Sequence, residues 1–214
     1  KYGVVVMTYD GLIEQIRKYL NRNDADTVNQ IPQFLANGEQ KICRESKNIG
    51  FTKYIVGNFI NEQAVYQKPA RWKRTLTFNY GTGQNNNTRN QLWLRTYEYA
   101  RIYWPDSSVV DLPRYYSDYG FDNWLVAPTP NAGYPFEVGY LELPEPLTKN
   151  NQQNWLSLYI PDILLYASLL QAMPYVKTDE RLPVWEKAYQ DGINALNAED
   201  DQRILDRGSN RRAD

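Results

Sequence analysis

Two glutamates in aromatic stretches are the residues best suited to catalysis in this chain of 214 residues. Glu98 lies in the run LWLRTYEYARIYW and Glu142 in GYLEL, and two carboxylates across a sugar site are the machinery of a glycoside hydrolase. The chain contains no histidine, the commonest general base. Strand carboxylates near arginines such as Arg95 and Arg101 are more often cross-strand partners. We therefore expect a protein that is not an enzyme.

A strip of aromatic and arginine side chains is the second candidate site. Period-two alternation over residues 92–104 predicts a strand. Tyrosine, tryptophan and arginine stack on sugars or single-stranded bases, and they are also enriched in protein interfaces. Core packing or a protein interface is favoured here over ligand stacking. The predicted face carries Trp93, Arg95, Tyr97, Tyr99, Arg101 and Tyr103.

Composition excludes several other chemistries. Cys43 is the only cysteine, so an intramolecular disulfide cannot form, and no zinc or other metal site is expected. The GTG at 81–83 lacks the lysine of a phosphate-binding loop and is expected to be a turn, so no cofactor is predicted. A net charge of −1 argues against tight binding of nucleic acid. Without a long apolar run, no membrane span is expected, and the chain is predicted to be cytoplasmic in origin.

Helical periodicity marks the N-terminal part of the chain. A helix is predicted from Thr8 to Leu20, with Thr8 or Asp10 as its cap. A second helix is predicted over residues 27–46, with Pro32 near its first turn. Gly38 costs this helix about 1 kcal/mol relative to alanine, so we expect another helix to approach closely there.

Two further helices are predicted near the C-terminus. Residues 161–173 have almost no polar face and must be covered on most sides, and Pro174 is expected to kink or end this helix around Met173. An amphipathic helix from Leu182 would cover it. Periodicity is lost after Leu205, and Gly208 is expected to end any helix. The predicted core of this bundle comprises Leu164, Leu165, Leu169, Met173, Trp185 and Tyr189.

The middle of the chain has the composition of a β region. Short apolar runs rich in tyrosine and tryptophan alternate with Gly, Pro, Asn and Asp. Residues 79–90 are predicted to form a long polar hairpin loop. The predicted strands cover residues 54–60, 74–80, 92–104, 123–127 and 135–143.

The predicted fold class is therefore α+β, with a four-helix-type bundle and an inserted antiparallel β subdomain. The N-terminal helical part takes residues 1–50 and the β-rich insert takes 51–150. The C-terminal helical part takes 151–202, and 203–214 form a charged tail.

Two parts of the sequence resemble a known family. NWLSLYIPDILLYASLLQAMPYVKTDERLPVWEKAYQDGINAL is similar to the C-terminal signature of head-to-tail adaptor (connector) proteins of tailed bacteriophages, especially short-tailed phages. YDGLIEQIRKYLNR and IPQFLANGEQKICRE resemble the paired N-terminal helices of that family, and together these pieces cover about half of the chain. The C-terminal features that carry the resemblance are Trp155, Pro161, the LLYASLLQA helix, Tyr175, DER, WE and Tyr189, and the N-terminal ones are Ile31, Pro32, Glu39, Ile42 and Arg44.

The resemblance implies a structural virion protein. Subunits of the family form a ring, usually twelve-membered, beneath the portal protein; the ring extends the DNA channel and docks the tail. The implied partners are the portal, tail or nozzle and fibre proteins, and other copies of this chain. Genomic DNA would pass without tight binding, and the protein would lie at the head–tail interface after assembly in the host cytoplasm.

Two surfaces follow as expectations from the resemblance. The C-terminal extension would dock on the portal through Arg203, Ile204, Leu205, Arg207, Arg211 and Arg212. The β region would face the tail through Trp93, Tyr97, Tyr99, Arg101 and Tyr103.

Two alternatives remain open. The aromatic β region could serve a virion module that binds carbohydrate or a receptor. An enzyme using Glu98 and Glu142 ranks last.

Overall fold

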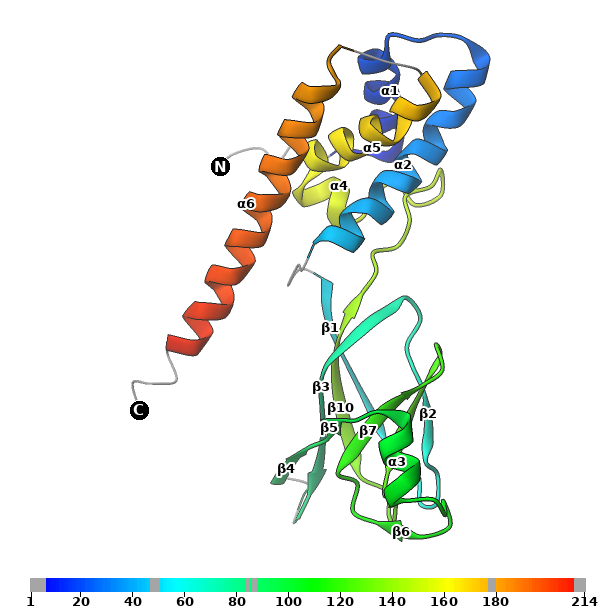
Figure 1. Cartoon of the computed structure of the whole chain (residues 1–214), viewed down its shortest axis with the longest axis vertical. Helices are drawn as coiled ribbons and strands as arrows, with labels where there is room; N and C mark the ends of the chain where they lie inside the picture. Colours follow the sequence, from blue (N-terminus) through cyan, green and yellow to red (C-terminus); the bar gives the residue numbers. More distant parts are fainter. Residues whose placement is uncertain (1–6, 47–50, 84, 86–87, 177–179, 210–214) are drawn as a thin grey trace. The chain divides into compact units, whose positions relative to one another are not determined.

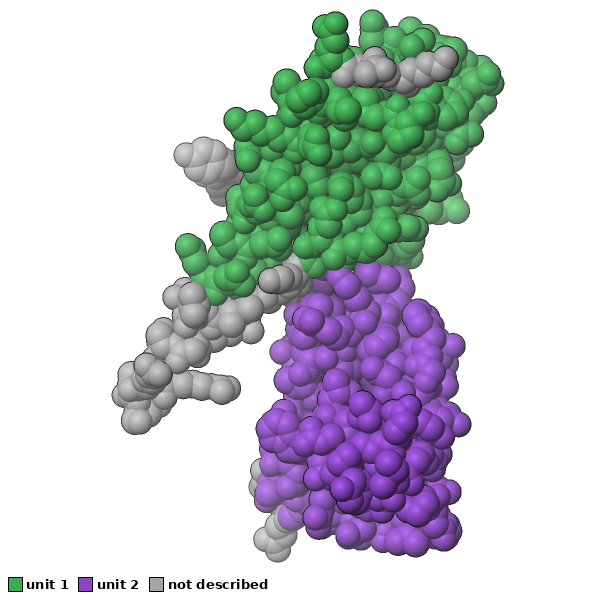
Figure 2. Space-filling model, viewed as in Figure 1, with its two compact units in different colours: residues 1–50, 144–214 green, residues 51–143 purple. Residues whose placement is uncertain are grey.

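The computed structural model describes residues 7–46, 51–83, 85, 88–176 and 180–209, with side chains described as far as residue 202 (Figure 1). The chain forms two compact units, one from residues 1–50 and 144–214 and the other from residues 51–143 (Figure 2). The second unit is an insertion in the first. Residues 144–150, which the sequence assigns to the β-rich part, group with the helical unit.

The inserted unit is built from two four-stranded sheets, a two-stranded sheet and a short helix, α3 (Tyr97–Tyr103). Neighbouring strands are antiparallel except in the parallel pairs β5–β7 and β6–β9. The first sheet has the order β1 (Thr52–Asn58), β10 (Pro135–Glu142), β3 (Trp72–Thr82), β4 (Thr88–Gln91). The second has the order β2 (Val65–Gln67), β8 (Asn123–Ala127), β7 (Tyr115–Tyr119), β5 (Trp93–Leu94), and β6 (Val110–Asp111) pairs with β9 (Thr129–Pro130).

A core of aromatic rings fills the inserted unit. Phe78 and Trp124 have no exposed surface, and their ring centroids are 5.4 Å apart. The ring centroid of Phe59 lies 4.9 Å from that of Phe136 and 5.9 Å from that of Phe78. Such ring pairs stabilise a core beyond the area they bury. Tyr116 also belongs to this core, so part of the predicted aromatic surface is interior packing.

Two predictions for this unit are wrong. The loop predicted over 79–90 is shorter, because residues 79–82 pair with residues 88–91 as the β3–β4 hairpin. The strand predicted over 92–104 ends at Leu94 and is followed by α3. The Thr96 side chain accepts a hydrogen bond from the Tyr99 N–H and caps this helix.

The helical unit is arranged around α5, which contacts α1, α2, α4 and α6 and lies between α2 and α6 in Figure 1. Within the described residues, no helix is long and apolar enough to cross a membrane. A regular four-helix bundle stays a prediction. The helices are α1 (Tyr9–Leu20), α2 (Ala25–Glu45), α4 (Trp155–Tyr159), α5 (Pro161–Val176) and α6 (Leu182–Ser209).

Polar caps fix where the N-terminal helices begin. The Thr8 hydroxyl accepts from the Gly11 N–H, so of the two predicted caps, Thr8 and Asp10, Thr8 is the one used. The Asp24 carboxylate accepts from the Thr27 N–H and starts α2 two residues before the predicted position. The prediction that Pro32 lies near the first turn is therefore wrong, because Pro32 lies inside α2.

Helices α5 and α6 both run further than predicted. Pro174 lies inside α5, which continues to Val176. A proline this close to a helix end removes a single hydrogen bond from the last turns, so the helix tolerates it. Helix α6 continues past Leu205 and Gly208 to Ser209. The six residues predicted as bundle core are all buried, namely Leu164, Leu165, Leu169, Met173, Trp185 and Tyr189.

A glycine allows α2 and α5 to approach closely, as predicted. A Cβ atom added at Gly38 would lie 2.6 Å from the Ser168 Oγ and 2.9 Å from the Ser168 backbone N. Ser168 has no exposed surface, and its hydroxyl donates to the Leu164 carbonyl oxygen at 2.7 Å. The serine therefore satisfies its own hydrogen bond within α5 while its backbone packs on the glycine.

Gly38→Ala should destabilise the helical unit because the new methyl group would overlap the α5 backbone. Overpacking costs about 1–3 kcal/mol, and the higher helix propensity of alanine returns about 1 kcal/mol. Chemical unfolding followed by far-ultraviolet circular dichroism should show a net decrease in the free energy of unfolding. Gln40→Ala, at an exposed position of the same helix, is the matched control and should change stability by less than about 0.5 kcal/mol. A Gly38→Ala protein as stable as the wild type would contradict the tight contact.

Candidate protein-docking surface

The residues predicted to face the tail lie on β5 and α3 rather than along one strand. Trp93 is 57% exposed and Tyr103 is 62% exposed, whereas Tyr99 and Arg101 are partly buried. Tyr97 is also exposed. Strand alternation therefore does not place these side chains on one common face.

Tyr99 is the centre of a cluster of rings on the outside of this unit. Its ring centroid lies 4.6 Å from that of Tyr103 and 5.7 Å from that of Tyr115. Trp104 lies 5.4 Å from Tyr115. The Arg95 guanidinium sits 5.6 Å from the Tyr99 ring centroid and 5.5 Å from that of Tyr115. Stacking on two rings holds this cation in place while leaving its charge at the surface.

A second arginine is held in the same way at the other side of α3. The Arg101 Nε donates to the Tyr97 hydroxyl at 3.2 Å, and the guanidinium lies 5.4 Å from the Tyr97 ring centroid. Tyr97 in turn contacts Tyr119, with 5.6 Å between ring centroids. Among the described residues, neither Arg95 nor Arg101 forms a salt bridge. Both guanidinium groups can therefore donate hydrogen bonds to a carboxylate of another protein.

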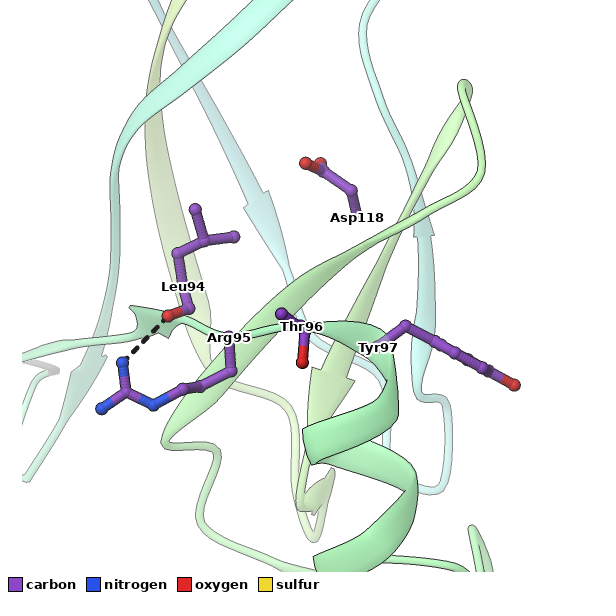
Figure 3. Close-up of a pocket in the computed structure, with 5 residues that line it drawn as sticks. All are labelled: Leu94, Arg95, Thr96, Tyr97 and Asp118. Atoms are coloured by element: carbon purple, nitrogen blue, oxygen red, sulfur yellow. Dashed lines mark hydrogen bonds between the residues drawn. The ribbon is translucent and has the colours of Figure 1, made fainter.

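An open hollow of about 480 Å³ lies beside this cluster, lined by Leu94, Arg95, Thr96, Tyr97 and Asp118 (Figure 3). Arg95 donates to the Leu94 carbonyl oxygen at 3.1 Å, and the ring of Tyr97 points away from that pair (Figure 3). Asp118 lies 2.9 Å from the Nζ of Lys68, so its charge is already paired. Small-molecule sites usually enclose most of their ligand. A shallow, open hollow is better suited to contact with a side chain of another protein.

Exposed apolar side chains extend this region into an interface-like patch. Ile102 is 74% exposed and Val109 is 58% exposed, close in sequence to the ring cluster. Apolar and aromatic side chains with interspersed arginines are the composition of protein interfaces. The name α3 surface is used below for Trp93, Leu94, Arg95, Tyr97, Arg101, Ile102 and Tyr103.

The two glutamates considered for catalysis have different surroundings. Glu98 lies in the first turn of α3, not in a strand as predicted. Glu142 lies in β10 and accepts a hydrogen bond from Arg71 at 3.2 Å. In the described part of the chain, no group of three or more Asp, Glu, Cys or His residues is placed to hold a metal ion.

The residues predicted to dock on the portal fall at the end of α6. The last turns of α6 contain Arg203, Ile204, Leu205 and Arg207, so the backbone there is helical and not an irregular tail. The structure does not describe the side chains of these four residues. Arg211 and Arg212 lie outside the described residues.

A model of the family described as SU10 adaptor protein matches residues 7–213. The match covers nearly the whole chain, including both units. The chain belongs to the SU10 adaptor protein family. This is a phage head-tail adaptor family, so the resemblance found in the sequence is confirmed. A search of the curated proteins finds no match.

Family membership fixes the broad setting of the adaptor. It is a phage structural protein and a component of the virion, associated with portal and tail components. The α3 surface lies on the inserted unit.

The helical unit of the adaptor holds a buried carboxylate, Glu39, which is among the residues that carry the family resemblance but whose burial was not predicted. The Glu39 side chain is 6% exposed and accepts hydrogen bonds from the Leu147 N–H, at 3.2 and 3.3 Å, and from the Asn154 Nδ2, at 2.6 Å. Asn154 also caps α4, where its Oδ1 accepts from the Ser157 N–H. The signal for Glu39 was its helical spacing from Ile31 and Leu35, which places it on the buried side of α2.

This network makes stability depend on pH. Burial raises the pKa of the Glu39 carboxyl from 4.5 to about 7, even though the bonds from Asn154 and Leu147 favour the charged form. Between pH 4.5 and 7 the folded protein keeps a proton that the unfolded chain has released. The free energy of unfolding therefore falls as pH rises through this window.

Glu39→Gln should remove that part of the pH dependence. A pKa shift of this size corresponds to at most about 3 kcal/mol. The free energy of unfolding of the wild type should therefore fall by up to that amount relative to that of Glu39→Gln between about pH 5 and 8. Denaturant unfolding at a series of pH values measures the difference. Glu186→Gln, at an exposed position of α6, is the control and should follow the wild-type profile. Parallel profiles for the wild type and Glu39→Gln would show that Glu39 does not titrate in this window.

Proposed function

We propose that this adaptor forms a ring beneath the portal, extends the DNA channel and offers the docking surface for the tail. The role is structural, without a catalytic activity. The ring is proposed to be a dodecamer assembled in the host cytoplasm, and the partners are the portal protein on one side and tail, nozzle or fibre proteins on the other. The observation that carries the proposal is the family match over both units, because it makes the complete two-unit architecture that of an adaptor.

The α3 surface supports the part of the proposal that concerns the tail. Its rings and arginines do not belong to the aromatic core of the inserted unit, which contains Phe59, Phe78 and Trp124. The two stacked guanidinium groups suit an acidic or carbonyl-rich partner surface. We assign this surface to contacts with tail or fibre proteins.

The charge balance supports a channel role. Twenty-four basic residues against 25 acidic ones give a surface without a large excess of positive charge. DNA that must slide through a ring would be held back by dense arrays of lysine and arginine, since each phosphate contact adds to affinity. Passage of the genome without tight binding is therefore compatible with the composition.

A second candidate function is recognition of a carbohydrate or receptor by the same surface. The observation that favours it is the exposure of Trp93 and Tyr103 close to the open hollow at Leu94 and Tyr97. Exposed rings stack on the apolar faces of sugars. Binding to a glycan array distinguishes this function, because a ring adaptor that contacts only proteins should give no signal there.

Native mass spectrometry of the adaptor mixed with its portal ring tests the proposal. We expect a closed complex with one adaptor per portal subunit. Truncation after residue 202 removes the last turns of α6 and the segment beyond it, and should abolish this complex if that end docks on the portal. Truncation after residue 209 keeps the whole of α6 but removes Arg211 and Arg212, so comparing the two truncations separates the end of the helix from these two arginines.

The outcomes separate two parts of the proposal. A complete absence of association by the wild type, at any ratio, would contradict the adaptor ring. Normal assembly by the protein truncated after residue 202 would contradict portal docking by Arg203, Ile204 and Leu205 while leaving the ring intact.

Substitutions on the α3 surface should separate tail attachment from ring formation. Trp93→Ser with Tyr103→Ser removes two rings that are more than half exposed, so folding should be preserved while tail attachment to adaptor-bearing heads is lost. Electron microscopy of assembled particles counts the tails. Tyr159→Ser, at a ring 69% exposed on α4, is the control and should leave attachment unchanged. Normal attachment in the double variant would assign tail docking to another surface.

A further inference from the structure

We propose that neighbouring adaptors join their inserted units edge to edge, with β1 of one copy pairing antiparallel to β4 of the next. The pairing would continue the strand order β1-β10-β3-β4 across the subunit boundary. This inference rests on the proposed ring and names the contact that would close it. The occupant of the open edge is thus a second copy of this chain.

The strand β1 is a long, open edge. In the described part of the chain it pairs only with β10, which leaves the backbone groups of its other side without a strand partner. Such an edge is a template for another strand, and soluble proteins usually keep edge strands short or charged. The other edges of the two four-stranded sheets follow that rule, with 4 residues in β4, 3 in β2 and 2 in β5. β1 has 7.

The outer face of β1 also carries apolar side chains that the unit does not cover. Val56 is 80% exposed and Tyr54 is 62% exposed. Between them, Ile55 pairs with the fully buried Val138 and belongs to the inner face. The Tyr54 ring covers Gly139, where an added Cβ would lie 2.9 Å from Tyr54 Cε1, so the ring lies against the outer surface of the sheet. β-branched and aromatic residues at an unpaired edge indicate an interface.

Strand directions favour a second copy in head-to-tail contact. β1, β10, β3 and β4 are antiparallel in turn, so β4 runs opposite to β1 in the same sheet. The rotation between neighbours in a many-membered ring is small and nearly preserves strand direction. The β4 edge of one copy therefore meets the β1 edge of the next in the antiparallel sense. Because this contact joins the two different edges of one sheet, it repeats around a ring and leaves neither β1 nor β4 without a strand partner after closure.

The side chains of the two edges are chemically complementary on the outer face. Val56 pairs with Glu137, Glu137 with Asn79 and Asn79 with Gln91, so Val56 and Gln91 share one face of the sheet. Arg89, two residues before Gln91, lies on that face as well.

If the outer faces of the two strands align, Arg89 and Gln91 of one copy lie beside Tyr54 and Val56 of the next. The arginine could then stack on the Tyr54 ring. A slip by one residue would bring the exposed Lys53 to the face of Arg89 and set two cations together.

Disulfide trapping tests the contact. The pairs Val56→Cys with Arg89→Cys and Tyr54→Cys with Arg89→Cys sample the two registers that match the outer faces. Both replaced positions of each pair are exposed, so the subunit should fold. After assembly on the portal and mild oxidation, a non-reducing gel should show a ladder of covalent multimers larger than a dimer for at least one pair, because opposite residues on paired strands lie within disulfide reach. Each single variant should give no ladder.

Phe121→Cys with Arg89→Cys is the matched control, because Phe121 is as exposed as Val56, at 80%, but lies between β7 and β8. It should give no ladder. Intact rings by native mass spectrometry without cross-links in either test pair would overturn the edge contact and leave the proposed ring in place. A covalent dimer from Val56→Cys alone would overturn it in favour of β1 pairing with β1. Failure of the wild type to form any ring would overturn both.

Discussion

The burial of α5 is the constraint on which the rest of the helical unit depends. A helix that is apolar around almost its whole circumference cannot lie on a surface, so it needs covering elements on several sides. Those elements come from both ends of the chain, with α1 and α2 before the insertion and α6 after it. The N- and C-terminal segments therefore pack together in one unit, although 93 residues of another unit separate them in sequence. Gly38 sets how closely α2 can approach, because its missing side chain leaves room for the backbone of Ser168.

Polar contacts then fix the positions of the segments around that apolar helix. Glu39 binds both Leu147 and Asn154, and Asn154 caps α4, so one carboxylate joins α2 to the segment that leads back from the insertion. Tyr189 donates to Glu45 at 2.6 Å and joins α6 to the end of α2. Buried polar groups cost stability unless they are paired, and for that reason they favour one arrangement over its alternatives. Packing holds the helices together, and these bonds specify their register.

The sequence predicted what depends on a strong and unambiguous period. The apolar helix at α5, the Thr8 cap and the close approach at Gly38 follow from spacing and side-chain size. Strands β1, β3, β8 and β10 were also predicted within a few residues. The start of α2 was predicted too close to Pro32, because the Asp24 cap begins the helix further upstream. Helix α5 continues past Pro174, because tertiary packing outweighs the local cost of a proline.

The candidate surface was harder to predict because aromatic and basic residues occupy every second position from residue 93 to residue 103. In such a run, strand and helix spacings both look satisfied. Residues four apart do meet in the structure, as Tyr99 and Tyr103 do, and so do Tyr97 and Arg101, which is the helical signature. The hydrogen-bond network of Glu39 was not predicted for a different reason, since nothing in a single sequence shows which partners will surround a buried acid.

Tyrosine explains why composition alone could not separate core from interface in the inserted unit. Two buried tyrosines have satisfied hydroxyl groups: Tyr80 donates to the Pro113 carbonyl oxygen at 2.8 Å, and Tyr66 donates to the Gln63 carbonyl oxygen. The same residue type stands exposed at Tyr54 and Tyr103. Because the inner core closes without those exposed rings, they contribute little to the folding of the unit. Their apolar surface would be buried only when another protein covers it, so we expect changes at these positions to affect contacts with other proteins more than folding.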